Sequence, residues 1–87
     1  MKQEFLKLYD STVDEIYGFC YYKLSDRELA KSITQDTYTK MWESMTAGYP
    51  TKHGKMILQG IAAKFVRQHQ DLERATHNRM VTTFKFS

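Results

Sequence analysis

The sequence is poor in the residues that interrupt regular structure. Pro occurs once, Gly four times and Cys once in 87 residues. A single Cys cannot form an internal disulfide, so a disulfide-stabilised fold is excluded. No run of about eighteen apolar residues occurs, which excludes a membrane-spanning helix in this sequence. Apolar and aromatic residues are nevertheless plentiful, and the composition therefore predicts one small, mostly helical domain with its own core.

Signals of an enzyme or of a metal site are also missing. We find no Gly-rich phosphate loop, no nucleophile elbow and no carboxylate pair at catalytic spacing. The three histidines, His53, His69 and His77, do not form with Cys20 the C-x-x-C or H-x-x-x-H spacing of zinc ligands. We therefore expect no catalytic activity, no metal and no cofactor.

The first predicted element is an amphipathic helix over residues 3–24. Its apolar side chains advance in steps of three or four, the spacing of one helix face. Cys20 lies on this face and is expected to be a buried small hydrophobe, and Gly18 would permit the close approach of another helix. The acids at positions 4 and 10 stand where a signal peptide would be apolar, which predicts a cytoplasmic protein. The stripe expected in the core is Leu6, Tyr9, Val13, Ile16, Cys20 and Leu24.

A second helix is predicted over residues 25–45. Ser25 is followed three residues later by Glu28, which is the pattern of a capping box and predicts that the helix begins at Ser25. One face repeats apolar residues at every fourth position and is expected to be buried. The opposite face is either a merely solvated surface or a binding surface. That polar face carries Arg27, Lys31, Gln35, Asp36, Lys40 and Glu43.

The order of residues in this second helix is similar to a known family. The helix contains the run Asp26-Arg27-Glu28-Leu29-Ala30, followed by Ile33-x-Gln35-Asp36-x-Tyr38-x-x-x-Trp42. This order resembles the second conserved helix of region 2 in bacterial sigma factors of the extracytoplasmic-function (ECF) group. The resemblance implies that Glu28, Gln35 and Asp36 dock on the clamp helices of the largest subunit of RNA polymerase. It also implies that Tyr38 and Trp42 belong to the core.

Two Gly and the only Pro after Met45 predict an exposed loop up to Gly54. Tyr49 in this loop precedes cationic residues, and an aromatic ring beside cations suits the capture of single-stranded nucleic acid. Packing of Tyr49 on the core is the alternative. In the ECF group the corresponding loop lies next to the promoter −10 element. The resemblance implies contacts with the non-template strand from Tyr49, Lys52, His53 and Lys55.

A third helix is predicted over residues 55–72, with one apolar face and one polar face. The apolar face is expected to comprise Leu58, Ile61, Ala62, Phe65, His69 and Leu72. The polar face resembles the promoter-reading helix of the family, which implies DNA contacts from Lys64, Arg67 and Gln68. The family's Trp is replaced by Ile57, and its Arg-Asn pair by Ala63 and Lys64. These departures weaken the expectation of promoter recognition.

The sequence thus predicts an all-α, three-helix domain similar to sigma-factor region 2 over residues 1–72. Residues 73–87 are expected to be a tail, an edge strand or a helix extension that binds a partner. Residues 1–51 carry a net charge of −2 and residues 52–87 a net charge of +5, which suits a protein partner on one side and a polyanion on the other. We expect a transcription initiation factor whose −35-reading, region 4-type domain is supplied by a second polypeptide. The alternative is a regulator that docks on RNA polymerase or a sigma partner without reading DNA.

Overall fold

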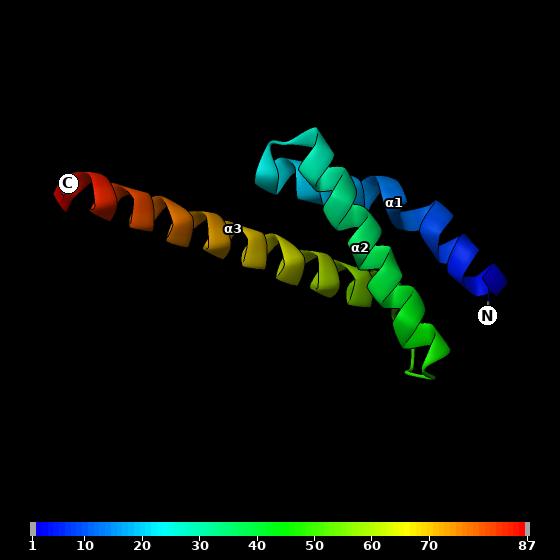
Figure 1. Cartoon of the computed structure of the whole chain (residues 1–87). Helices are drawn as coiled ribbons and strands as arrows, with labels where there is room; N and C mark the ends of the chain where they lie inside the picture. Colours follow the sequence, from blue (N-terminus) through cyan, green and yellow to red (C-terminus); the bar gives the residue numbers. More distant parts are fainter. Residues whose placement is uncertain (1, 87) are drawn as a thin grey trace.

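The structure, a computed structural model, describes the backbone of residues 2–86 and the side chains of residues 2–75. The chain forms three helices, α1 (Lys2–Leu24), α2 (Arg27–Thr46) and α3 (Gly54–Phe86), and no strand occurs within the described backbone. The predicted all-α, three-helix class is confirmed. Helices α1 and α2 form an antiparallel hairpin, and α3 returns across both of them (Figure 1).

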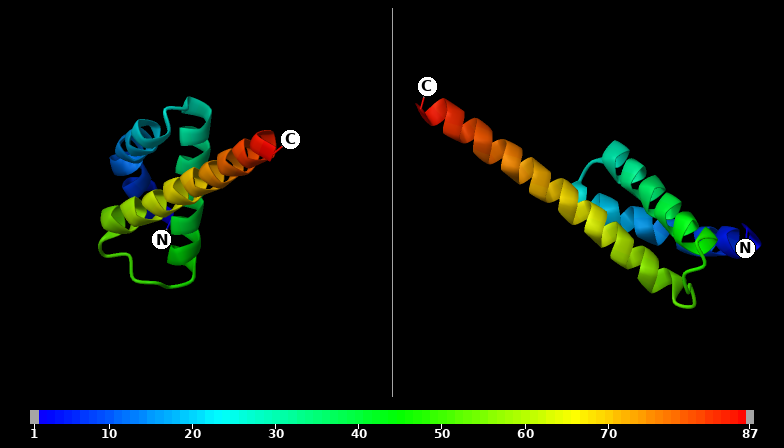
Figure 2. Two further views of the ribbon diagram at one scale, coloured as in Figure 1. Left: turned by 90° about the vertical axis from the view of Figure 1, so that its left-hand side faces the viewer. Right: turned by 60° about the horizontal axis from the view of Figure 1, so that its bottom comes forward.

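Helix α3 is much longer than the helices against which it packs. Its first half lies on α1 and α2, while its second half projects beyond them, so that the molecule measures 57 × 24 × 16 Å (Figure 2). The predicted end at Leu72 is wrong, because the helix continues to Phe86. Of the three alternatives for residues 73–87, the backbone follows the helix extension. The side chains of residues 76–87 lie outside the described part of the chain.

The turn between α1 and α2 is closed by two adjacent residues with different roles. The backbone N–H of Ser25 donates to the carbonyl of Tyr21 at 2.7 Å, and Ser25 has φ 54°, so it ends α1 in the left-handed conformation. Asp26 is extended, and its carboxylate accepts from the backbone N–H of Leu29 at 3.1 Å. The N-cap of α2 is therefore Asp26. The predicted capping box at Ser25 is wrong by one residue.

The core lies where the three helices meet. Cys20 is fully buried, as predicted. Thr34 and Thr37 are also buried, and each hydroxyl donates to the carbonyl four residues earlier, at 2.7 and 2.8 Å. This bond satisfies the hydroxyl and lets threonine serve as a core residue. The buried apolar residues are Ile16, Cys20, Ala30, Ile33, Tyr38, Met41, Met45, Leu58, Ala62 and Val66.

Four residues expected in the core are partly exposed instead. The exposed fraction is 48% for Leu6 and 36% for Trp42, and Tyr9 is similarly open. These three lie along the α1–α2 seam, in a hollow that none of the described α3 side chains lines. Leu72 is 66% exposed and belongs to the second half of α3, which projects beyond the other two helices. A helical pattern gives the width of an apolar stripe, but not how much of it a third helix covers.

The close approach expected at Gly18 is found elsewhere. Nothing lies within 4 Å of the position that a Cβ of Gly18 would occupy. At Gly54, the first residue of α3, a Cβ would lie 2.9 Å from the Leu8 side chain. The contact that needs glycine therefore joins the start of α3 to α1. Within the described residues, none of the helices has an apolar stretch that could cross a bilayer.

Candidate functional site

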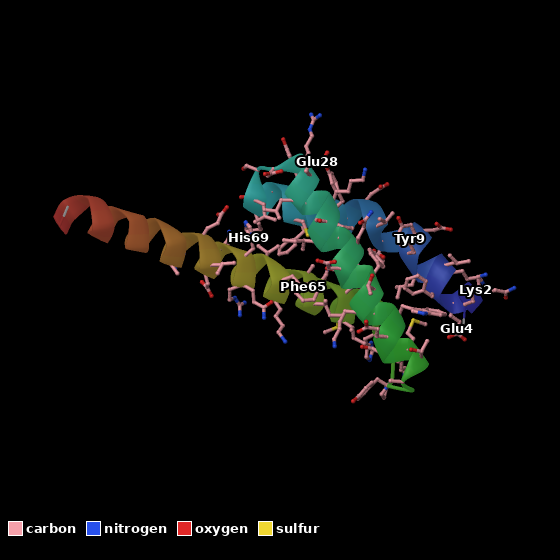
Figure 3. The ribbon with its side chains drawn as sticks, viewed as in Figure 1. Lys2, Glu4, Tyr9, Glu28, Phe65 and His69 are labelled. Carbon is pink, nitrogen blue, oxygen red and sulfur yellow. The ribbon has the colours of Figure 1, made fainter. Side chains whose placement is uncertain are left out.

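The outer face of α2 presents the residues that the resemblance selects. Glu28, Gln35 and Asp36 are all exposed and lie opposite the buried row of this helix. At about 1.5 Å per residue they span about 12 Å along the axis. Glu28 stands at the start of α2, on the side away from α3 (Figure 3). We call this surface, defined by Glu28, Gln35 and Asp36, the α2 outer face.

The carboxylates of the α2 outer face are available to a partner. Among the described residues, ion pairs form between Lys55 and Glu15 and between His69 and Glu73, and neither involves α2. A partner that brings cationic or hydrogen-bond-donating side chains would therefore meet two carboxylates and one amide without first breaking an internal pair.

Three backbone hydrogen bonds join the start of the loop of residues 47–53 to the last turn of α2. The N–H groups of Ala47, Gly48 and Tyr49 donate to the last carbonyls of α2 at 3.0–3.1 Å. Gly48 has φ 86°, a conformation that favours glycine. The Tyr49 side chain is 68% exposed, so the alternative in which it packs on the core is wrong. Lys52 and His53 are also exposed, which leaves an open aromatic ring on a loop that carries cations.

Helix α3 carries a second cationic surface. Lys64, Arg67 and Gln68 are exposed, within about one helical turn of one another and opposite the buried row of Leu58, Ala62 and Val66. We call these three residues the α3 basic face. Met56 and Gly60, which were not among the predicted site residues, are exposed on the same side of this helix. A helical projection of the sequence could have found them.

The predicted DNA-binding residues do not form one surface. Lys55 lies on the inward side of α3, and its ammonium group is 3.0 Å from the carboxylate of Glu15 on α1. Both side chains are more than half exposed, so this pair contributes little to stability. Its effect is to direct Lys55 towards α1 and away from the α3 basic face. The other predicted DNA-binding residues belong either to the loop or to the α3 basic face.

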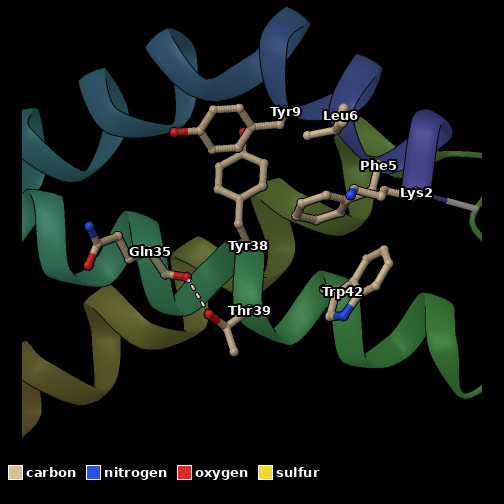
Figure 4. A pocket seen from close by; sticks show the side chains of 8 residues that line it. All are labelled: Lys2, Phe5, Leu6, Tyr9, Gln35, Tyr38, Thr39 and Trp42. Atoms are coloured by element: carbon tan, nitrogen blue, oxygen red, sulfur yellow. Dashed lines mark hydrogen bonds between the residues drawn. The ribbon is translucent and has the colours of Figure 1, made fainter.

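A groove that the sequence analysis did not anticipate runs along the α1–α2 seam. Three edge-to-face ring pairs form its floor: Phe5 with Trp42 at 5.2 Å between centroids, Phe5 with Tyr38 at 6.3 Å, and Tyr9 with Tyr38 at 4.8 Å (Figure 4). Its volume is about 770 Å³. The residues that line it, here called the seam groove, are Lys2, Phe5, Leu6, Tyr9, Gln35, Tyr38, Thr39 and Trp42.

A buried hydroxyl pair lies beneath the seam groove. Tyr38 and Thr12 form a hydrogen bond, and the Thr12 hydroxyl donates its proton to the carbonyl of Leu8. Because Thr12 has only one proton, Tyr38 is the donor in the first bond. Burial raises the pKa of Tyr38 above its usual value of 10.0. The pair is a structural link between α1 and α2.

The described residues contain no group of three or more His, Cys, Asp and Glu side chains that could hold a metal ion. His69 is half-buried, and its Nε2 lies 3.1 Å from a carboxylate oxygen of Glu73. His53 is on the exposed loop, and the side chain of His77 lies outside the described residues. What these residues offer is binding surface on α2, on the loop and on α3.

No family model, no curated protein and no solved structure matches the chain. The function proposed below therefore depends on the order of residues in α2 and on the surfaces described above.

Proposed function

We propose that this chain is a transcription initiation factor of the sigma type. It binds RNA polymerase core through the α2 outer face and engages the −10 promoter element through the loop and the α3 basic face. A separate domain reads the −35 element. The observation that carries the proposal is the exposure of Gln35 and Asp36 on a helix whose residue order resembles the polymerase-docking helix of ECF sigma factors.

The arrangement of the three helices supports this division of roles. The α2 outer face carries two carboxylates, with Lys31 and Lys40 exposed on the same polar side of the helix, whereas the loop and the α3 basic face carry cations and no carboxylate. Partners of opposite charge can therefore approach different sides of the domain at the same time. An exposed Tyr49 beside Lys52 suits a flipped or unpaired base, because stacking contributes roughly 1–3 kcal/mol per base and the lysine neutralises a phosphate.

Charge reversal on α2 tests the docking step. Asp36→Arg places a cation on the α2 outer face without touching the core, and we expect it to abolish co-purification with polymerase core. Asp10→Arg is the matched control, because it makes the same charge change at an exposed position of α1. Both variants should keep the circular dichroism of the parent chain. An Asp36→Arg variant that co-purifies like Asp10→Arg would contradict the proposal.

Fluorescence anisotropy with a single-stranded −10 non-template oligonucleotide tests the DNA step. Tyr49→Ala should weaken binding by about 1–3 kcal/mol at one salt concentration. Lys64→Ala should lower the slope of log K against log salt by about 1, because one phosphate contact is lost. A matched oligonucleotide with a scrambled −10 sequence should bind more weakly.

The second candidate is a regulator that docks on polymerase or on a sigma partner and does not read DNA. The observation that favours it is the departure at Ile57, Ala63 and Lys64 from the family's promoter-reading pattern, in a helix whose Ile57 is partly buried and unavailable to DNA. The same anisotropy series separates the two candidates. Equal binding of −10 and scrambled oligonucleotides, together with loss of polymerase binding in Asp36→Arg, would support the regulator.

A further inference from the structure

The seam groove is an apolar surface of which the proposed function uses only Gln35. Leu6, Tyr9 and Trp42 are each more than a third exposed, and they line the same hollow. Their rings and side chains belong to the apolar stripes of α1 and α2, which extend further round each helix than α3 covers. Exposed apolar residues that gather in a single groove mark a binding site more strongly than the same residues scattered singly.

The seam groove continues past its central residues into a second hollow. Tyr9 and Gln35 line both hollows, and the second one reaches Asp14 on α1 and Lys31 on α2. From Trp42 to Lys31 the groove follows α2 for about 16 Å, or about three helical turns. Its length therefore fits a partner helix of about twelve to sixteen residues.

The walls determine which backbone conformation can occupy the groove. Both walls are helices, so they offer no free strand edge with which a peptide in the β conformation could pair. The rings of Phe5, Tyr9, Tyr38 and Trp42 pack edge to face on one another and form a floor, not a set of separate slots for a proline-rich ligand (Figure 4). A groove between two antiparallel helices accepts the ridge of a third helix.

The charges along the groove indicate the chemistry of that helix. Among the described residues, Lys2 is the only charged residue that lines the seam groove itself, whereas the far hollow is lined by both Lys31 and Asp14, whose charges offset each other. No carboxylate of the described residues lies within ion-pair distance of Lys2. An occupant with acidic residues beside its apolar stripe would pair with Lys2. A basic occupant would meet a like charge there.

We infer that the seam groove is a docking site for an amphipathic, acidic α-helix of a partner protein. The helix places apolar residues at i, i+3 or i+4 and i+7 against Leu6, Tyr9 and Trp42, and acidic residues towards Lys2. Gln35 lines the groove and also belongs to the α2 outer face, so the two surfaces adjoin, but the carboxylates of Glu28 and Asp36 do not line the groove.

Trp42 provides the readout for a direct test. It is the only Trp of the chain, and it lines the groove. The probe is a synthetic peptide of about sixteen residues without Trp or Tyr, with Leu on one helical face and Glu beside it. Binding should shift the Trp42 emission to shorter wavelength and reduce its quenching by acrylamide. A peptide of the same composition in scrambled order, and one with Lys in place of Glu, should bind at least tenfold more weakly.

Matched variants distinguish the groove from general hydrophobic adhesion. Leu6→Glu should weaken binding of the acidic peptide at least tenfold. Leu72→Glu, the same change at an exposed leucine of α3, should leave it unchanged. Lys2→Glu should reverse the preference between the Glu and Lys peptides. Asp36→Arg should retain peptide binding even where polymerase binding is lost, so failure of the proposed function and failure of this inference are distinguishable.

Several outcomes would overturn the inference. Equal effects of Leu6→Glu and Leu72→Glu, or equal binding of the ordered and scrambled peptides, would show that the groove is not the site. A Trp42 shift that depends on protein concentration alone would identify a second copy of the chain as the occupant. Tighter binding of a proline-rich peptide than of the acidic helix would contradict the proposed conformation of the partner.

Discussion

A hydrogen bond between two buried side-chain hydroxyls links α1 to α2 in this small core. Thr12 and Tyr38 join α1 to α2 through a bond whose donor follows from proton counting, since the Thr12 proton is already donated to the Leu8 carbonyl. Both side chains are buried, so neither can exchange its partner for water. Removing one hydroxyl leaves the other polar group buried without that partner, which costs more than the bond itself contributes.

A double-mutant cycle on this pair tests the proton assignment. Thr12→Val should lower the free energy of unfolding by about 1–3 kcal/mol, because it leaves the Tyr38 O–H without an acceptor. Tyr38→Phe should cost less, about 1 kcal/mol, because the Thr12 hydroxyl keeps its bond to Leu8. The double variant should cost less than the sum of the two. Urea unfolding followed by circular dichroism measures all four proteins, and strict additivity would contradict a direct bond.

The turn between α1 and α2 allows a second prediction at the level of single residues. Ser25→Gly should raise the free energy of unfolding by up to about 1 kcal/mol, because glycine adopts a positive φ without steric cost. Asp26→Ala should lower it by about 1 kcal/mol, because the Leu29 N–H loses its cap. A capping box at Ser25 would give the opposite result for Ser25→Gly. Thermal unfolding of the two single variants decides between these possibilities.

At the level of the helices, the sequence predicted both ends of α1 and α2 and the beginning of α3 to within two residues, but not the end of α3. The ends of α1 and α2 lie within two residues of expectation because Ser25, Asp26 and Gly48 are strong local signals. The end of α3 was placed fourteen residues too early, since residues 73–87 offer no apolar periodicity of their own. Helical backbone can continue there because the preceding turns are already formed and no Pro or Gly stops it.

Only part of the candidate site could be predicted from the sequence. The sequence predicted the exposed positions of Gln35 and Asp36, because they lie opposite a regular apolar row. It did not predict the groove at Trp42, since a residue at the border of an apolar stripe becomes core or surface according to the neighbouring helix. Nor did it predict the Lys55–Glu15 pair, whose partners are distant in sequence and meet only through the packing of α3 on α1.

The two exposed helix glycines, Gly18 of α1 and Gly60 of α3, give a prediction about the helices. A Cβ at either position meets nothing within 4 Å. Gly18→Ala and Gly60→Ala should each raise the free energy of unfolding by about 0.5–1 kcal/mol, because alanine loses less backbone entropy in a helix. Thermal or urea unfolding measures both. If Gly60 serves close approach of a nucleic-acid backbone, Gly60→Ala should also weaken oligonucleotide binding, whereas Gly18→Ala should not.

At the level of the whole molecule, the acidic and basic parts of the sequence form different parts of the structure. The acidic front part forms the α1–α2 hairpin, and the basic remainder begins in the loop and continues along α3. The hairpin therefore presents the α2 outer face and the seam groove to proteins, while the loop and α3 present cations. A domain of this size has a stability of only several kcal/mol, and partners that bind the folded state add to it.

Two buried titratable groups in the core, Cys20 and Tyr38, make the stability of the domain depend on pH. Burial raises the pKa of the Cys20 thiol above 9.0 and that of the Tyr38 hydroxyl above 10.0. Both groups remain protonated in the folded state at pH values where they ionise in the unfolded chain. The stabilisation is therefore complete below about pH 9 and is lost as the pH rises through the folded pKa values. Urea unfolding between pH 7 and pH 11 should show a free energy that is flat at first and then falls.

A variant at Tyr38 separates its share of the loss of stability at alkaline pH from that of Cys20. In Tyr38→Phe the decline that begins near pH 10 should be smaller than in the parent chain, because one ionising group has been removed. The decline that begins near pH 9 should remain, since Cys20 is still present. Tyr22→Phe is the matched control, because it removes a hydroxyl that is exposed and should leave the profile unchanged. Identical profiles for Tyr38→Phe and Tyr22→Phe would contradict a contribution of the buried Tyr38 hydroxyl to the alkaline loss.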